Sequence, residues 1–234
     1  ARESADARGP RSRLVVRARA ASEAKDVPAV VAELIAAADD ADPRVRQAAI
    51  GALAHPRSLS PRHHGLLEAT LVRRVTGDPW TFVRAGSADA LASLPASLRA
   101  DEALSKAIGD ASPDVRGRAI DGLGAHRSTA HAERVRDRFE DKREGLEVRA
   151  RAILALARMC DRGSVDRFTE LAQRAVNPFS EADRRLGSAA IAALGTMHPS
   201  DLERRLAPLM AKDAPHGVRE MAKAALSEIG ECGR

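Results

Sequence analysis

The chain has 234 residues and a formal net charge of +5, with 44% hydrophobic residues but only 2% aromatic residues. A hydrophobic content built mainly on Ala, Leu and Val favours closely packed helices. It argues against a β-sandwich or β-barrel, whose strands are rich in β-branched and aromatic residues. No stretch reaches the roughly 18 consecutive apolar residues of a transmembrane helix, so no membrane span is expected.

The N-terminal residues account for most of the net positive charge. Residues 1–19 contain six Arg and two acidic residues, which leaves a net charge of +1 for residues 20–234. We therefore expect residues 1–13 to form an Arg-rich polar tail or linker. The remaining chain lacks the electrostatic footprint of a nucleic-acid-binding protein, so nucleic acid is disfavoured as a partner.

A repeated helical pattern organises the rest of the chain. In each copy a Val or Leu is followed by small residues four and seven positions later and by Leu eight positions later. These offsets lie on one face of an α-helix. A short break and a second helical segment follow each copy except the last. The six copies run over residues 45–53, 83–91, 115–123, 148–156, 186–194 and 218–226.

The predicted repeat unit is therefore a helix, a turn and a second helix. A degenerate copy, with helices expected at residues 14–24 and 27–38, begins the series, and the last copy consists of its first helix only. We predict about seven units in a single domain over residues 14–234. The dipeptides Asp42-Pro43 and Asp78-Pro79 predict helix starts with Asp as the N-cap and Pro in the first turn.

The motif Asp-Pro-x-Val-Arg-x-x-Ala-x-x-x-Leu, read from Asp42 to Leu53, resembles the HEAT-like repeats of phycobilisome-lyase-type and many other bacterial proteins. The resemblance implies an all-α, right-handed α-solenoid, with the first helices on the convex layer and the second helices on the concave face. It also implies an inter-repeat ladder in which the Arg of each motif pairs with an acidic residue such as Glu144. The predicted ladder residues are Asp42, Arg46, Asp78, Arg84, Arg116, Arg149 and Arg219, and Gly187 replaces the Arg in the fifth copy.

Motifs for catalysis or metal binding are missing from the sequence. It holds no Gly-x-Ser-x-Gly elbow, no His-Glu-x-x-His motif and no Gly-Lys phosphate loop. The single His pair, His63-His64, lacks an obvious set of converging donors. Two cysteines do not predict a disulfide framework, and Cys160 is interpreted as a small packing residue. We therefore assign no catalytic residue, no metal and no cofactor.

A helical solenoid exposes an extended surface and needs no catalytic residue. We expect a non-enzymatic scaffold or adaptor that binds another protein, either alone or as a subunit of a larger assembly. The alternative is a nucleic-acid-binding protein or a lyase-type enzyme on the same scaffold, although few aromatic residues are present to stack on bases or to flank a tetrapyrrole. The compartment stays open between the cytoplasm and, if a signal peptide preceded Ala1, export to the periplasm.

The two longest repeats each place an aromatic residue just after a Pro, namely Trp80 and Phe179. The extra residues move Trp80 off the packing stripe, which begins at Val83. Trp80 is then either a buried lid over the repeat edge or an exposed anchor, because Trp is enriched at interface hot spots. The second helices alternate in charge, which also fits a solvated, salt-bridged face. The candidate partner-binding residues are Trp80, Phe179, Arg73, Arg74, Arg138 and Arg205.

Overall fold

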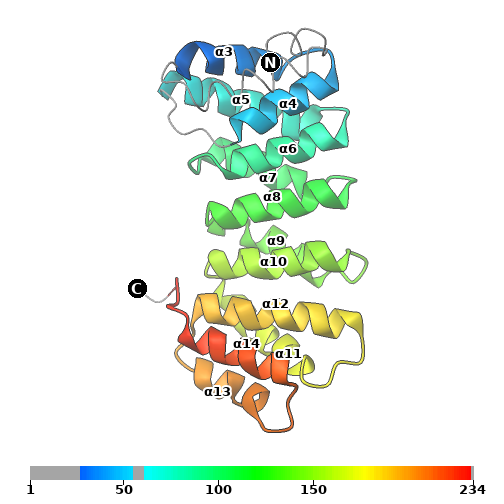
Figure 1. Cartoon of the computed structure of the whole chain (residues 1–234), viewed down its shortest axis with the longest axis vertical. Coiled ribbons are helices and arrows are strands. Elements are labelled where there is room, and N and C mark those ends of the chain that lie inside the picture. Colours follow the sequence, from blue (N-terminus) through cyan, green and yellow to red (C-terminus); the bar gives the residue numbers. More distant parts are fainter. Residues whose placement is uncertain (1–26, 55–60, 233–234) are drawn as a thin grey trace, which may run out of the picture. The chain divides into compact units, whose positions relative to one another are not determined.

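The computed structural model describes residues 27–54 and 61–232. Within these ranges the chain forms twelve α-helices, three short 3-10 helices and no β-strand (Figure 1). The predicted all-α fold class of stacked helix pairs is thereby confirmed. The expected polar tail at residues 1–13 and the helix expected at residues 14–24 lie outside the described residues.

The chain divides into two compact units, of which unit 1 extends to Gly122 and unit 2 begins at Leu123. The boundary falls inside helix α8 (Pro113–Ala125). The expectation of a single domain over residues 14–234 stays a prediction.

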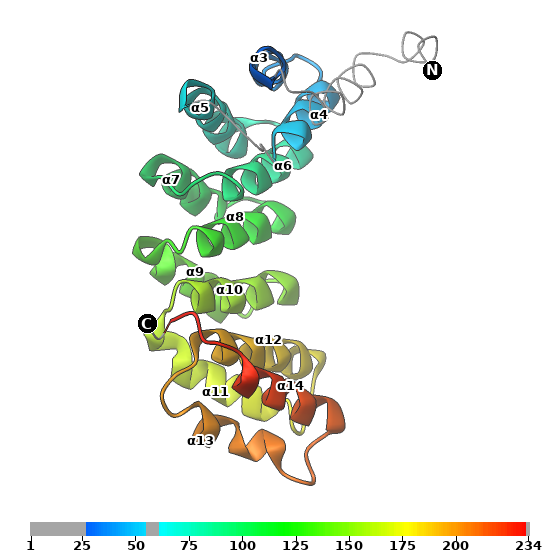
Figure 2. The same ribbon diagram turned by 60° about the vertical axis from the view of Figure 1, so that its left-hand side comes forward.

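Unit 1 contains two layers of helices. Contacts join α3 to α5, α5 to α7, and α4 to α6, so that successive second helices pack together, as do successive first helices (Figure 2). The second helices are α3 (Val27–Ala37), α5 (Pro61–Gly77) and α7 (Leu98–Ala107), and the first helices are α4 (Pro43–Leu53), α6 (Thr81–Ala92) and the start of α8.

Unit 2 continues the same alternation. Helix α12 lies against α10, α11 and α14, and α10 also packs on α9. The first helices are α10 (Leu146–Arg158), α12 (Glu181–Met197) and α14 (His216–Ser227). The second helices are α9 (Ala132–Glu140), α11 (Val165–Arg174) and α13 (Leu202–Leu206). A short 3-10 helix adjoins each of them, namely η1 (Thr129–His131), η2 (Arg162–Ser164) and η3 (Ala207–Met210).

Small residues allow the helices of each unit to approach closely. The small residue four positions after the first Val or Leu of the pattern, called the fourth-position residue below, is fully buried in every copy because a neighbouring helix covers it. In the last described helix, α14, the Val218 and Leu226 side chains are only half-buried. The fourth-position residues are Ala49, Ser87, Ala119, Ala152, Ala190 and Ala222.

Gly187 explains why the fifth copy lacks the motif Arg. A Cβ atom at this position would lie 2.8 Å from both the Ala175 Cβ atom and the Leu171 carbonyl oxygen. Helices α11 and α12 therefore pack too closely at this point for any side chain. An Arg at residue 187 would force the two helices apart.

A disulfide joins Cys160 and Cys232, which contradicts the interpretation of Cys160 as a packing residue. The two Cα atoms lie 5.4 Å apart although the residues are separated by 72 positions in the sequence. Cys160 is half-exposed in the turn after α10, and the segment after α14 turns back to reach it.

The packing of α12 predicts that the same substitution at two nearby positions has unequal effects on the free energy of unfolding. Ala190 is completely buried, so Ala190→Leu is expected to lower the free energy of unfolding by about 1–3 kcal/mol through overpacking. Ala192 is exposed in the same helix, so Ala192→Leu is expected to change it by less than about 0.5 kcal/mol. Chemical denaturation of the two variants checks the prediction, and a larger loss for Ala192→Leu would show that the helix face is assigned incorrectly.

Candidate functional site

A buried ion pair joins two repeats of unit 1. Arg46 of α4 donates from Nε to Asp78 Oδ2 over 2.7 Å and from Nη2 to Asp78 Oδ1 over 3.0 Å. The same carboxylate accepts the Trp80 backbone N–H at 3.0 Å and the Arg74 Nη1 at 3.2 Å. Both Arg46 and Asp78 are buried. A buried ion pair is tolerated when hydrogen bonds satisfy it in this way.

The hydrogen bonds decide the protonation state of Asp78. Burial acts to raise the pKa of its carboxyl group, but the hydrogen bonds from Arg46 and from the Trp80 N–H, with the charges of Arg46 and Arg74, outweigh this effect. The pKa of Asp78 therefore lies below its ordinary value. The carboxylate stays ionised although it is buried.

The same geometry recurs one repeat later. Arg84 donates to the Asp110 carboxylate from Nε over 2.6 Å and from Nη2 over 3.0 Å. The Ser112 N–H donates to Asp110 Oδ1 over 2.8 Å, as the Trp80 N–H does to Asp78. Burial acts to raise the pKa of Asp110, but the hydrogen bonds and the charge of Arg84 lower it by a larger amount. The pKa of Asp110 therefore lies below its ordinary value.

Each motif Arg of unit 1 also fixes the loop before its own helix. Arg46 donates to the carbonyl groups of Asp40 and Ala41. Arg84 donates in the same way to the carbonyl groups of Asp78 and Pro79. Arg116 repeats the pattern with the carbonyl groups of Asp110 and Ala111. Arg46 and Arg84 therefore connect one loop–helix junction to the next repeat.

Sequence reasoning missed Asp110 and gave Asp42 a different role. Asp42 accepts the Arg44 N–H over 2.9 Å as the N-cap of α4. Its side-chain hydrogen bond with Arg44 lowers the pKa of Asp42 to about 2. The acids that bind Arg46 and Arg84 instead lie six residues before the Arg of their own copies. This spacing could have identified Asp110 from the sequence.

In unit 2 the motif Arg residues bind backbone groups. Arg149 donates from Nε to the Phe139 carbonyl over 2.9 Å. Arg219 donates to the carbonyl groups of Lys212 and Ala214. Glu144, the further acid expected in the ladder, accepts the Gly145 N–H over 2.8 Å and is buried.

The contact with Asp78 determines the position of Trp80. Trp80 is the N-cap residue and α6 begins at Thr81, two residues before Val83, as α4 begins at Pro43, two residues before Val45. The expected helix start, with Asp78 as the N-cap and Pro79 in the first turn, is therefore wrong. The Trp80 side chain is 51% exposed. Its ring centroid lies 5.6 Å from that of Phe82 at an interplanar angle of 41°.

A hollow of about 380 Å³ lies beside this aromatic pair. Small residues from α4 and α6 line it, and a Cβ atom at Gly51 would meet no other atom within 4 Å. Arg118 binds Asp114 over 2.9 Å and also pairs with Asp89. We call this surface the unit 1 groove; its residues are Trp80 and Phe82 with Gln47, Ala48, Gly51, Ala85, Gly86, Asp89, Asp114 and Arg118.

The candidate Arg residues of the second helices differ in their surroundings. Arg73 and Arg74 both bind Asp39, over 2.9 Å and 2.6 Å respectively. Arg205 binds Asp166 and Asp201, each over 2.7 Å. Arg138 is half-buried. Three of these four guanidinium groups are therefore already paired within their own unit.

Phe179 lies in the loop before α12 and is 99% exposed. Its backbone N–H donates to Asp183 Oδ2 over 3.2 Å. It lines a hollow of about 640 Å³ together with polar residues such as Arg174 and Asn177. Phe179 belongs to unit 2 and Trp80 to unit 1, so the two aromatic residues form separate candidate sites.

In the part of the chain that the structure describes, no group of three or more His, Cys, Asp or Glu residues could hold a metal ion. None of the helices described there is both long and apolar enough to span a membrane.

Comparison with known proteins relates part of the chain to a repeat family. Residues 100–182 match the family model for HEAT repeats. The finer resemblance to the phycobilisome-lyase type finds no support in this match. A search of curated proteins gives no match to the chain.

Solved structures of designed repeat proteins share the fold. A designed armadillo repeat protein in complex with the peptide (KR)4 has a TM-score of 0.53 and 18% identity, covering 83% of this chain and 97% of that chain. An engineered protein has a TM-score of 0.54 and 18% identity, covering 84% of this chain and 96% of that chain. At this identity the likeness shows the fold alone, which is that of a helical repeat protein.

The buried ion pair predicts unequal effects for two Asp substitutions in unit 1. Asp78→Ala leaves the buried Arg46 guanidinium without its partner, so we expect a loss of about 3–5 kcal/mol in the free energy of unfolding. Asp114 is an exposed partner of Arg118 in α8, so Asp114→Ala is expected to cost less than about 1 kcal/mol. Urea denaturation at neutral pH measures both, and equal losses would contradict the assigned role of Asp78.

The lowered pKa values of Asp78 and Asp110 predict a loss of stability in acid. An Asp carboxyl group of the unfolded chain titrates near about pH 3.9, and in the folded state Asp78 and Asp110 titrate lower. Their contribution is therefore complete above that pH and is lost as the pH falls through the folded-state pKa. Asp78→Asn is expected to flatten this dependence in denaturation curves below about pH 4. An unchanged slope in the variant would contradict the prediction.

Proposed function

We propose that the chain is a non-enzymatic scaffold or adaptor that binds another protein, and that the unit 1 groove receives a segment of that partner. Repeat proteins of stacked helix pairs commonly present extended binding surfaces. A designed armadillo repeat protein of similar fold was solved in complex with the peptide (KR)4. This likeness supports a peptide segment of the partner as the group that the groove binds.

The half-exposed Trp80 beside Phe82 is the observation that carries this proposal. When a partner covers the half-exposed Trp ring, the remaining apolar surface of the ring is removed from water, and this burial favours binding. Trp is also enriched among the residues that contribute most to binding energy. The Trp80 backbone is held by the buried Asp78 carboxylate over 3.0 Å. The Trp80 backbone is therefore fixed before a partner arrives, which lowers the part of the entropy cost of binding that comes from the backbone.

The groove also indicates the chemistry of the bound segment. Its small residues, including Ala48 and Gly51, leave room for an apolar side chain of the partner. The carboxylates of Asp89 and Asp114 share the guanidinium group of Arg118, which leaves these three side chains with one net negative charge. A segment with an apolar residue close to a Lys or Arg complements this surface.

The second-helix Arg residues give less support to the nucleic-acid alternative. Arg73 and Arg74 bind Asp39, and Arg205 binds Asp166 and Asp201. Binding of a phosphate backbone would have to replace these ion pairs. The negative charge of the unit 1 groove would also repel phosphate groups.

Selection from a phage-displayed library of random peptides tests this proposal directly. We expect the full chain to enrich peptides that contain an apolar residue near a Lys or Arg. Trp80→Ala is expected to weaken binding of these peptides by about 30-fold or more, corresponding to about 2 kcal/mol. Because Trp80 is the only Trp of the chain, its fluorescence should shift to shorter wavelength when a synthetic peptide binds.

The matched control is Leu98→Ala, which changes an exposed apolar residue of α7 in the same unit. This variant should bind the selected peptides as the wild type does. Equal binding by Trp80→Ala, or enrichment of acidic peptides, would contradict the proposed site.

A further inference from the structure

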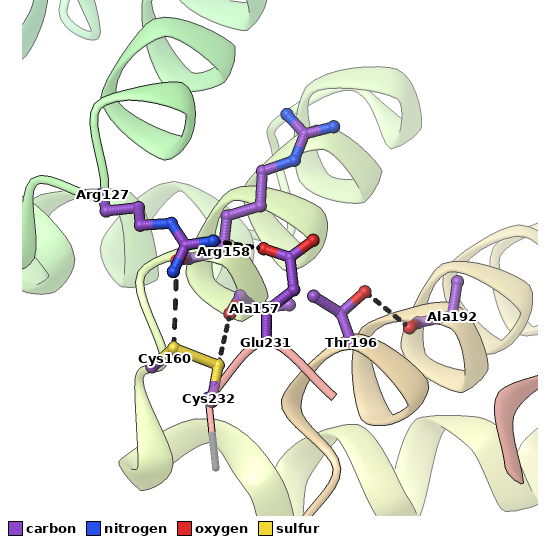
Figure 3. Close-up of a disulfide and its surroundings, with 8 residues drawn as sticks. All are labelled: Arg127, Ala157, Arg158, Cys160, Ala192, Thr196, Glu231 and Cys232. Carbon is purple, nitrogen blue, oxygen red and sulfur yellow. Dashed lines mark hydrogen bonds and ion pairs between the residues drawn. A yellow bond between two sulfur atoms is a disulfide. The ribbon is translucent and has the colours of Figure 1, made fainter. Parts of the chain in front are cut away.

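The segment after α14 crosses the surface of unit 2. It turns back toward α12 and α10, where the Glu231 N–H donates to the Thr196 carbonyl over 2.8 Å. A Cβ atom added at Gly230 would lie 2.1 Å from the His198 Cβ atom, so only Gly fits against this turn. Figure 3 shows how Cys232 then reaches Cys160. We call residues 228–232 the C-terminal strap.

The strap lies over corresponding positions in three successive repeats. Arg127, Cys160 and His198 each lie twelve residues after the start of their repeated pattern. They are the non-Gly residues with positive φ in the described part of the chain, at 52°, 57° and 46° respectively. Glu231 pairs with Arg127 over 2.6 Å, Cys232 bonds to Cys160, and Gly230 packs on His198. The strap therefore contacts the turns that end α8, α10 and α12.

Apart from the disulfide, the strap contacts unit 2 through the Glu231 N–H hydrogen bond to the Thr196 carbonyl and the contact of Gly230 with His198. Cys232 Sγ also lies 3.4 Å from the Ala157 carbonyl oxygen. Ile229 is 78% exposed, so this large apolar residue contributes almost no buried surface. The Arg127–Glu231 ion pair is exposed on both sides, and such pairs contribute little to stability. Ordering the five residues has an entropy cost at each of them. The covalent bond therefore keeps the strap ordered on the turns.

The disulfide is placed where a thiol can reach it. Cys232 lines a hollow of about 870 Å³ with residues of η2, α11, α13 and the end of α12, among them Arg162 and His198. In Figure 3 the Arg127 guanidinium group points toward the Cys160 sulfur. A cation beside a cysteine favours its thiolate, so Cys160 is suited to be the leaving group.

We propose that Cys160 and Cys232 are a site of reversible thiol–disulfide exchange with a dithiol, and that reduction releases the C-terminal strap from unit 2. A thiolate of the dithiol attacks Cys232 Sγ, the S–S bond breaks, and Cys160 leaves as a thiolate that takes a proton. The second thiol, after losing its proton, attacks the resulting mixed disulfide, and Cys232 leaves and is protonated. The dithiol supplies two electrons and becomes a disulfide.

Release of the strap changes the surface and leaves the core intact. It frees the Arg127 guanidinium group and the Thr196 carbonyl, and it opens one wall of the hollow lined by Cys232. The small residues that pack α10 against α12, such as Ala152 and Ala190, do not depend on the strap because they are buried by neighbouring helices. This site lies in unit 2 and does not rest on the function proposed for the unit 1 groove.

Hydrogen exchange of the full chain, measured by mass spectrometry, tests the proposal with dithiothreitol as the dithiol. Reduction is expected to accelerate exchange in peptides that cover residues 228–232 by at least about tenfold, with the protection of α10 and α12 unchanged. Oxidised glutathione should restore the slow exchange, and thiol alkylation should confirm both states. Unchanged exchange of the strap on reduction would overturn the proposal. Simultaneous loss of protection in α10 and α12 would also overturn it, because the disulfide would then be a structural crosslink.

Two variants separate the disulfide from the other contacts. Cys232→Ser should show fast exchange of the strap with and without dithiothreitol. Glu231→Gln removes the ion pair with Arg127 but keeps the disulfide, so its strap should remain protected when oxidised and be released when reduced. Slow exchange in Cys232→Ser, or failure of this variant to fold, would contradict the proposed switch.

Discussion

The buried carboxylate of Asp78 connects the packing of unit 1 to its surface. Arg46 of the preceding repeat binds both oxygens of this group, and Oδ1 also accepts the N–H of Trp80. The Arg46 side chain in turn binds two carbonyl groups of its own loop. A loop, two helices and an aromatic residue are thus held by a few charge-assisted hydrogen bonds in a region shielded from water.

Close packing of small residues makes this arrangement possible and limits where it can occur. Ala and Ser at the fourth position of the repeated pattern let neighbouring helices approach, which keeps Arg46 and Asp78 out of water. At Gly187 the approach of α11 is so close that the motif Arg is replaced. In unit 2, Arg149 and Arg219 donate to backbone carbonyl groups, and a disulfide joins the turn after α10 to the segment after α14.

The periodicity of the sequence was sufficient to predict the helices, because offsets of four, seven and eight residues describe one helix face. The same reasoning placed Arg46 and Arg84 at repeat junctions through a family resemblance. It could not show that Asp78 would point inward, since that choice depends on the position of Arg46 in the neighbouring repeat. The N-cap at Trp80 agrees with the two extra residues between Asp78 and Val83, because α4 and α6 both begin two residues before the first Val of the pattern.

The disulfide shows a different limit of sequence reasoning. Cys160 and Cys232 are 72 positions apart, and nothing between them indicates that the chain turns back after α14. The fit of Gly230 against His198 and the ion pair of Glu231 with Arg127 appear only once the repeats are stacked. A pattern that describes one repeat at a time cannot predict the contacts that a terminal segment makes across several repeats.

The Asp78 carboxylate positions the exposed aromatic surface of unit 1 through its hydrogen bond with the Trp80 N–H. Time-resolved fluorescence anisotropy of Trp80, the only Trp, measures the freedom of this side chain in the wild type and in Asp78→Asn. We expect faster and wider ring motion in the variant while its far-UV circular dichroism still shows folded helices. Identical anisotropy decays in the two folded proteins would contradict the account, because Trp80 would then be held by other contacts.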